Sequence, residues 1–299
     1  MNAKSILSPN HLVPVLEALL VTVLWSTSWV LIKYGLDDIP ALTFAGLRYT
    51  LAFLVLVPFV LLRPKHFEAV KSLDRRQWTQ LSLLGLVFYT LTQGAMFMAL
   101  AHMPAMPTSL ILSFSPAAVA LLGVPFLGEY PSRLQWGGMV IFLAGILVYF
   151  YPFEMVFKAL GLAAALVGLV ANVVGSVMGR AVNRRRDLHP LVVTVVSMGV
   201  GAVVLLLIGV AAQGLPTLSG KSWGIVIYLA VVNTALAFTL WNHTLRQLTA
   251  MESSIINNTM LLQIVILAWA FLGEPLGWKA VLGIGLAAIG ALLVQLRRA

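Results

Sequence analysis

The sequence predicts an all-α integral membrane protein in which ten transmembrane helices form two inverted five-helix repeats around a central cavity, with both termini in the cytoplasm. Three observations predict this architecture: the composition, an internal repeat and the distribution of basic residues. Of the 299 residues, 60% are hydrophobic and 10% are charged, whereas a soluble domain usually carries about 25% charged residues. The net charge of +9 is attributed to basic membrane loops, and no nucleic-acid partner is expected.

The apolar segments each approach the roughly 20 residues that cross a bilayer, and clusters of Pro, Gly and charge separate them. Two longer connections, 63–78 and 182–189, are basic, and no other segment is long enough for a soluble domain. The ten predicted spans run at about 13–33, 41–62, 79–101, 105–127, 133–151, 159–180, 189–212, 222–245, 251–272 and 277–296.

An internal repeat divides the chain near its middle. The sequence Phe-Leu-Gly-Glu occurs at 126–129 and again 145 residues later at 271–274. Further identities keep this offset without a gap, for example Met106 with Met251, Gly138 with Gly283 and Gly145 with Gly290. Such a run predicts a duplicated unit, with one five-helix repeat at 1–152 and the second at 153–299.

The basic residues predict the orientation of the repeats. With ten spans, the side of the termini carries most of the Lys and Arg, including Arg184, Arg185 and Arg186, whereas the other side carries Lys33, Lys158, Lys221 and Lys279. The positive-inside rule therefore places both termini in the cytoplasm. Because five spans per repeat is an odd number, the second repeat must be inverted. Inverted repeats are common in secondary transporters, whose site lies near the membrane midplane.

Polar and aromatic residues inside predicted spans are the candidates for substrate binding, because such groups are costly in a bilayer. They concentrate in spans 1, 3, 4, 6, 8 and 9, which we place around the cavity, while spans 2, 5, 7 and 10 read as scaffold. The alternative is that single Asn and Ser residues only join helices, at about 0.6 kcal/mol each. The candidates are Trp25, Ser28, Trp29, Tyr89, Gln93, Ser113, Asn172, Ser176, Asn233, Trp241, Asn242, His243 and Asn258.

Charged groups within the spans are few. Arg48 is the most inward charge, and it either pairs with Asp37 or Asp38, snorkels outward, or attracts a carboxylate. Glu17 lies near the cytoplasmic start of span 1, and His243 is a candidate proton relay. Because so few titratable groups lie deep in the spans, the sequence does not require transport to be coupled to protons. Facilitated export down a gradient fits equally well.

Enzyme and cofactor signals are absent from the sequence. It has no His-Glu-x-x-His, no Gly-rich phosphate loop and no Gly-x-Ser-x-Gly motif. It has no cysteine either, which excludes disulfides and thiolate metal sites. We therefore expect no enzyme, no cofactor and no metal. The expected partners are a small-molecule substrate and the lipid bilayer, and a monomer suffices to enclose the cavity.

Several motifs resemble the EamA-type members of the drug/metabolite transporter superfamily. They are the run from Leu24 to Trp29 followed by Ile32-Lys33, the Leu47-Arg48 pair after Pro40, and Leu-Gly-Glu at 127–129 and 272–274. The second repeat departs from the first in having Leu261 where the first has Pro116. Within the superfamily, the aromatic, carboxylate-poor interior resembles the YddG-type exporters of aromatic amino acids. That resemblance implies export across a bacterial inner membrane.

Three functions follow as hypotheses. The first is export of aromatic or other apolar amino acids by alternating access, because aromatic walls and amides suit such ligands. The second is proton-coupled efflux of cationic drugs, which requires Glu17 or His243. The third is a membrane scaffold or enzyme that transports nothing.

Overall fold

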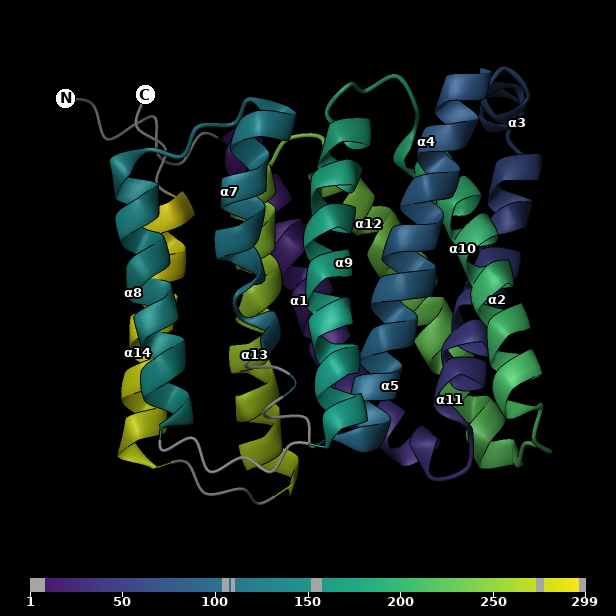
Figure 1. Cartoon of the computed structure of the whole chain (residues 1–299). Coiled ribbons are helices and arrows are strands. Elements are labelled where there is room, and N and C mark those ends of the chain that lie inside the picture. Colours follow the sequence, from purple (N-terminus) through teal and green to yellow (C-terminus); the bar gives the residue numbers. More distant parts are fainter. Residues whose placement is uncertain (1–8, 104–107, 109–110, 152–157, 273–276, 296–299) are drawn as a thin grey trace.

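The computed structural model describes residues 9–103, 108, 111–151, 158–272 and 277–295, which form a bundle of long helices (Figure 1). Within these residues every regular element is helical and no strand occurs, in agreement with the predicted all-α class. Six helical segments are long and apolar enough to cross a membrane, and three shorter apolar helices accompany them. The count of ten spans and the side of the termini remain predictions.

The helices follow the predicted spans closely. Two of the spans contain a π-helical stretch: η2 lies between α4 and α5, and η3 lies between α11 and α12. In chain order the elements are α1 (Pro9–Leu36), α2 (Ala41–Leu61), α3 (Pro64–Lys71), α4 (Arg75–Gly85), η2 (Leu86–Gln93), α5 (Gly94–His102), α7 (Ser115–Leu127), α8 (Arg133–Phe150), α9 (Ala159–Asn183), α10 (Pro190–Gln213), α11 (Gly220–Ala230), η3 (Val231–Leu236), α12 (Ala237–Thr244), α13 (Ala250–Leu272) and α14 (Trp278–Gln295). The first residues of the span predicted at 105–127 lie outside the described part of the chain.

The connection predicted at 63–78 is partly helical. α3 begins at Pro64, whose fixed φ suits the first position of a helix. α4 begins after Asp74, whose carboxylate accepts a hydrogen bond from the Gln77 backbone N–H in a capping box. The sequence prediction took this charged segment for a loop and missed the helix start signals within it.

The outer surface of the bundle is apolar. Large side chains such as Leu20, Leu121 and Leu207 point outward and are 52%, 62% and 65% exposed. A soluble protein rarely leaves so continuous an apolar face in water. This surface fits contact with lipid, as the composition predicted.

Two antiparallel helix pairs flank the bundle, α8 with α14 and α2 with α10 (Figure 1). Between α8 and α14, glycines bring the backbones together. A Cβ added to Gly145 would lie 2.6 Å from the carbonyl oxygen of Gly283, and one added to Gly290 would lie 2.6 Å from that of Gly138. Such close approach is typical of helix packing in membranes, and α8 and α14 hold the position expected of scaffold. The same expectation is wrong for α2, whose Arg48 and Tyr49 line the cavity described below.

Hydrogen bonds between helix starts and helix ends establish that the flanking pairs are antiparallel. The Gln135 amide, at the start of α8, donates to the Val294 carbonyl near the end of α14 at 3.2 Å. The Leu42 backbone N–H, at the start of α2, donates to Gln213 at the end of α10 at 2.7 Å. In the first half α2 and α8 are therefore antiparallel to their counterparts in the second half, α10 and α14 respectively.

The bundle has two chemically different ends. We call one the arginine-rich end; the ends of α7, α9 and α12 meet there with the starts of α10 and α13. The other, the lysine end, joins the end of α1 to the end of α5 and the start of α2 to the end of α10. The arginine-rich end carries Arg180, Arg184, Arg185, Arg186 and Arg246, and the lysine end carries Lys33, Lys221 and Lys279.

The secondary structure repeats with the offset of the sequence. α4 and α11 begin at Arg75 and Gly220, and η2 and η3 begin at Leu86 and Val231; in both cases the two starts are 145 residues apart. α8 and α14 also keep this offset at both of their ends. Each half therefore carries a π-helical stretch at the same position, and these stretches position the site described next.

Candidate functional site

A cavity of about 90 Å³ lies between α1, α2, α9, α12, α13 and the rod formed by α4, η2 and α5. It has room for several water molecules, since one requires about 10–15 Å³ of such space. Its wall is mostly apolar, with a small number of polar groups, as is usual for small-molecule sites. The lining residues are Trp25, Ser28, Trp29, Ile32, Arg48, Tyr49, Phe88, Thr92, Gln93, Met96, Leu112, Gly168, Asn172, Phe238, Asn257, Asn258 and Met260.

Aromatic rings form one wall of the cavity, with Phe238 at their centre. The ring of Phe238 lies 4.9 Å from Trp25 and 5.2 Å from Tyr89, centroid to centroid. Phe88 and Tyr49 each lie 5.9 Å from it. The interplanar angles of these pairs run from 50° to 87°, which is the tilted or edge-to-face geometry that aromatic pairs favour. The wall is thus a rigid apolar surface.

Trp25 is held in place by the π-helical stretch η3. Its indole Nε1 donates to the Asn233 carbonyl oxygen at 3.0 Å. The side-chain amide of Asn233 in turn donates to Thr27 and Ser28 of α1, at 3.0 and 2.9 Å, and also to the Leu24 carbonyl. Asn233 therefore joins α1 to η3 and orients the cavity wall, without lining the cavity itself.

The π-helical stretches explain why spacing arguments fail locally. In η2 the Thr92 hydroxyl donates to the Val87 carbonyl, five residues earlier, at 2.9 Å. π-helical turns of this kind are rare and frequent at functional sites. Tyr89 and Gln93 are four residues apart, a spacing that puts side chains on one face of a regular α-helix, yet they line two different pockets.

Amide groups supply most of the polar atoms of the cavity. Gln93 and Asn258 are 8% and 4% exposed. Asn172 donates its Nδ2 to the Ser115 hydroxyl at 3.2 Å, and Asn258 donates its Nδ2 to the Ser254 carbonyl at 3.0 Å. Each of these bonds uses one of the two N–H groups of its amide, and the amide oxygens remain as acceptors.

The structure gathers most of the predicted site residues, although in two places. Trp25, Ser28, Trp29, Gln93, Asn172 and Asn258 line the cavity. Tyr89, Ser176, Trp241 and Asn242 line a smaller adjoining pocket of about 10 Å³.

Three predicted residues line neither pocket. Ser113 is fully buried, and Asn233 positions Trp25 as described. His243 lies at the arginine-rich end, where its Nδ1 is 2.8 Å from the Glu17 carboxylate.

Sequence reasoning missed several lining residues, notably Phe88, Thr92 and Phe238. Phe residues at mid-span look like ordinary lipid-facing or core side chains, so no pattern distinguished them. Asn257 carried a usable signal, because it is a second amide beside Asn258 within a predicted span.

Arg48 also lines the cavity, and it is 2% exposed. Its guanidinium donates from Nε to the Thr234 hydroxyl at 2.7 Å and from Nη2 to the Asn233 carbonyl at 3.3 Å. It neither snorkels nor pairs with Asp37 or Asp38, and the Asp38 carboxylate accepts from Ser222 at 2.8 Å.

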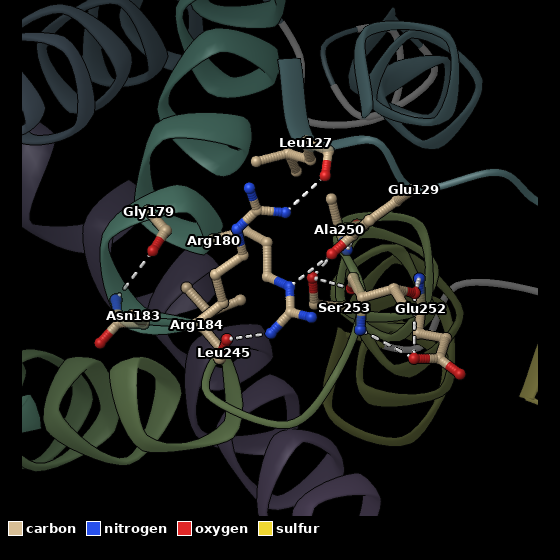
Figure 2. A network of polar contacts seen from close by, with 11 residues as sticks. Leu127, Glu129, Gly179, Arg180, Asn183, Arg184, Leu245, Ala250, Glu252 and Ser253 are labelled. Carbon is tan, nitrogen blue, oxygen red and sulfur yellow. Dashed lines mark hydrogen bonds and ion pairs between the residues drawn. The ribbon is translucent and has the colours of Figure 1, made fainter. Parts of the chain in front are cut away.

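A polar network joins helix ends at the arginine-rich end (Figure 2). The Glu129 carboxylate accepts from Arg180 Nε on α9 and from the Ala250 N–H at the start of α13, both at 2.8 Å. Arg180 also donates to the Leu245 carbonyl after α12 at 2.8 Å. Glu129 can reach these partners because α7 ends at Gly128, whose φ of 65° is the left-handed conformation of a helix C-terminus. The network joins four helices.

The apolar bundle and its internal cavity with few polar groups define a multi-pass membrane protein of the transporter class. The EamA-like transporter family matches residues 12–151 and 159–296. The chain therefore belongs to this family, which confirms the resemblance noted in its motifs.

Relatives named as transporters cover nearly the whole chain. The inner membrane transporter YedA of Escherichia coli K12, described as uncharacterized, is 24% identical over 96% of this chain and 92% of its own. A probable terminal-alkyne amino-acid exporter of Streptantibioticus cattleyicolor is 25% identical over 94% and 93%. A solved crystal structure superposes with a TM-score of 0.78 at 19% identity, covering 95% of this chain and 98% of the other, and shows the same fold. The chain is a multi-pass protein of the bacterial inner membrane.

Proposed function

We propose that this transporter exports aromatic or other apolar amino acids from the cytoplasm by alternating access, with the central cavity as its substrate site. The observation that carries the proposal is the cavity wall, which combines the rings of Trp25, Trp29 and Phe238 with amide groups. Among the described lining residues there is no carboxylate. Aromatic side chains pack well on such a wall, and the amides suit a polar head group.

Alternating access is supported by the symmetry of the bundle. Equivalent helices of the two halves, α8 with α14 and α2 with α10, lie antiparallel. That is the relation expected of inverted repeats at 1–152 and 153–299. The clustering of arginines at one end favours that end as cytoplasmic, so the lysine end would face outward.

A flux assay in proteoliposomes tests the proposal. We expect exchange of labelled Phe or Trp, and competition by other apolar amino acids. Trp25→Ala removes a stacking surface and should weaken apparent affinity about fivefold, by about 1 kcal/mol; Gln93→Ala should also reduce flux. Trp223→Ala is the matched control, because Trp223 is 44% exposed on α11 and does not line the cavity.

Intact flux in both cavity variants, at equal amounts of protein, would reject the site assignment. No flux of any amino acid across the panel would reject the function.

Proton-coupled efflux of cationic drugs is the second candidate, and the contact between Glu17 and His243 favours it. The pair joins α1 to α12 and could carry a proton. Arg48 in the cavity wall opposes it, because a buried cation repels a cationic substrate. If Glu17→Gln leaves pH-driven flux unchanged, the carboxylate version of this mechanism is excluded.

A further inference from the structure

Arg48 is a buried charge whose described partners are all neutral. It bonds to the Thr234 hydroxyl and the Asn233 carbonyl, and its guanidinium carbon lies 5.2 Å from the centre of the Tyr49 ring. A charge this deep in a membrane protein is costly unless it is paired.

The structure shows other partners for two of the candidate carboxylates, and Asp37 is not within ion-pair distance of Arg48. The Asp38 carboxylate accepts from Ser222, and that of Glu17 contacts His243. Within the described part of the chain, no carboxylate lies within ion-pair distance of Arg48. The negative charge that Arg48 needs is therefore not found among those residues.

The geometry leaves one side of the guanidinium available. The two hydrogen bonds engage Nε and Nη2, and in the described residues Nη1 has no such bond. A guanidinium has five N–H donors in a planar fork that matches a carboxylate. Because Arg48 lines the cavity, a ligand there can meet this fork.

The same cavity offers an acceptor without a donor. The Oδ1 atom of Asn257 is buried and has no hydrogen-bond partner among the described residues, and Asn257 lines the cavity. A buried acceptor left unsatisfied costs about 1–3 kcal/mol, so a ligand that donates a hydrogen bond there would be stabilised. One fixed cation and one free acceptor match the two halves of a zwitterion.

We propose that Arg48 is the carboxylate-binding group of the transporter, and that Asn257 Oδ1 accepts a hydrogen bond from the ammonium group of the same ligand. This inference rests on the proposed function and names the head group that the cavity selects. It assigns the substrate class as α-amino acids with an intact carboxylate. Phosphorylated ligands fit less well, because Arg48 is the one cation among the described lining residues.

Ligand analogues test the carboxylate site on the unaltered protein. Competition against labelled Phe would be measured with phenylalaninamide, which lacks the carboxylate charge, and with 3-phenylpropionate, which lacks the ammonium group. Charge-assisted hydrogen bonds predict that the amide competes at least about tenfold more weakly than Phe. Equal competition by Phe and its amide would overturn the inference while leaving the proposed function intact.

Two variants separate binding from structure. Arg48→Gln should abolish the discrimination between acid and amide, and Arg48→Lys should retain part of it, because a lysine keeps the charge and loses the fork. Thr50→Val on the same helix is the matched control, because Thr50 donates to the Ala202 carbonyl and does not line the cavity; it should keep the discrimination. Discrimination that survives in folded Arg48→Gln contradicts the inference, and if that variant does not fold, the analogue result on the unaltered protein decides.

A thermal-shift panel covers the case in which no amino acid is transported. Paired acids and amides, such as 3-phenylpropionate and its amide, would be added to the purified protein. Protection by the acids alone would support the carboxylate site although the transport proposal had failed. Equal protection by both members, or by neither, would refute it.

Discussion

At both ends of the bundle a basic side chain donates a hydrogen bond to a carbonyl at the end of a neighbouring helix, but the two ends differ in the other contacts of that side chain. At the arginine-rich end, Arg180 near the end of α9 donates to the Leu245 carbonyl at 2.8 Å. At the lysine end, Lys33 near the end of α1 donates to the Leu100 carbonyl at 3.1 Å and to Met103 at 3.5 Å. Leu100 and Leu245 are 145 residues apart and therefore occupy equivalent positions in the two halves. In each half a basic side chain donates a hydrogen bond to this carbonyl.

The two ends differ in that a carboxylate forms an ion pair with the basic side chain at the arginine-rich end. Glu129 pairs with Arg180 and caps α13 through Ala250, and the side chains of the ion pair are only 17% and 11% exposed. Among the described residues no carboxylate lies within ion-pair distance of Lys33, and Asp37 interacts with its charge only at longer range. Glu274, which matches Glu129 in the repeat, lies outside the described residues. Lys33 and Arg180 both donate charge-assisted bonds to carbonyls, so among the described residues the ion pair with Glu129 is the contact that distinguishes the arginine-rich end. The described contacts hold the helices together more strongly at the arginine-rich end, so the lysine end should open at lower cost.

The largest effect should come from breaking the ion pair at the arginine-rich end. Glu129→Gln removes the charge that pairs with the mostly buried Arg180 guanidinium. We therefore expect the free energy of unfolding to fall by about 2 kcal/mol, measured by thermal unfolding in detergent. Glu68→Gln is the control, because Glu68 lies on the short surface helix α3. An unchanged unfolding temperature in Glu129→Gln would remove the proposed difference between the ends.

A smaller effect is expected at the lysine end. Lys33→Met removes hydrogen bonds to two carbonyls and keeps the apolar stem, so the loss should be about 1 kcal/mol. Measured by the same unfolding assay, it should be below that of Glu129→Gln. A loss as large as that of Glu129→Gln would make the two ends equivalent.

The smallest effect should be a pH dependence confined to the arginine-rich end. Partial burial, and then the neighbouring His66 ring at 4.4 Å, lower the pKa of His189, whose Nδ1 caps α10 by accepting from Leu191 N–H. The pKa of His189 in the folded protein is therefore below its unfolded value of about 6.5. The contribution of His189 to folding stability is complete above pH 6.5, and it is lost as the pH falls below that value toward the folded pKa. His189→Asn keeps an acceptor and does not titrate, so the drop in unfolding temperature between pH 7.5 and 5.5 should shrink. The same drop in both proteins would contradict this.

Much of this comparison could be predicted from the sequence. The Leu-Gly-Glu motif at 127–129 predicted a helix end and a duplicated unit, since glycine favours the left-handed turn that ends α7. Trp25, Trp29 and Gln93 were placed in the cavity from their depth in apolar spans.

Other features depend on tertiary contacts that the sequence does not reveal. η2 and η3 change the helical period locally, so no argument from α-helical spacing could place Tyr89. The partner of Arg48 could not be deduced either, because Thr234 lies 186 residues away in sequence. Long-range pairs of this kind are decided by how the halves pack.

We propose that one cavity opens in turn at the two ends, and labelling of single cysteines tests this most directly. The chain contains no cysteine, so Ser176→Cys and Ile32→Cys each give one site. Ser176 lines the small pocket toward the arginine-rich end, and Ile32 lines the cavity near Lys33. Labelling with a maleimide that does not cross membranes would be compared with and without Glu129→Gln. The account predicts faster labelling of Ser176→Cys together with slower labelling of Ile32→Cys when the ion pair is broken. Changes in the same direction at both sites, or at neither, would contradict alternating access through this cavity.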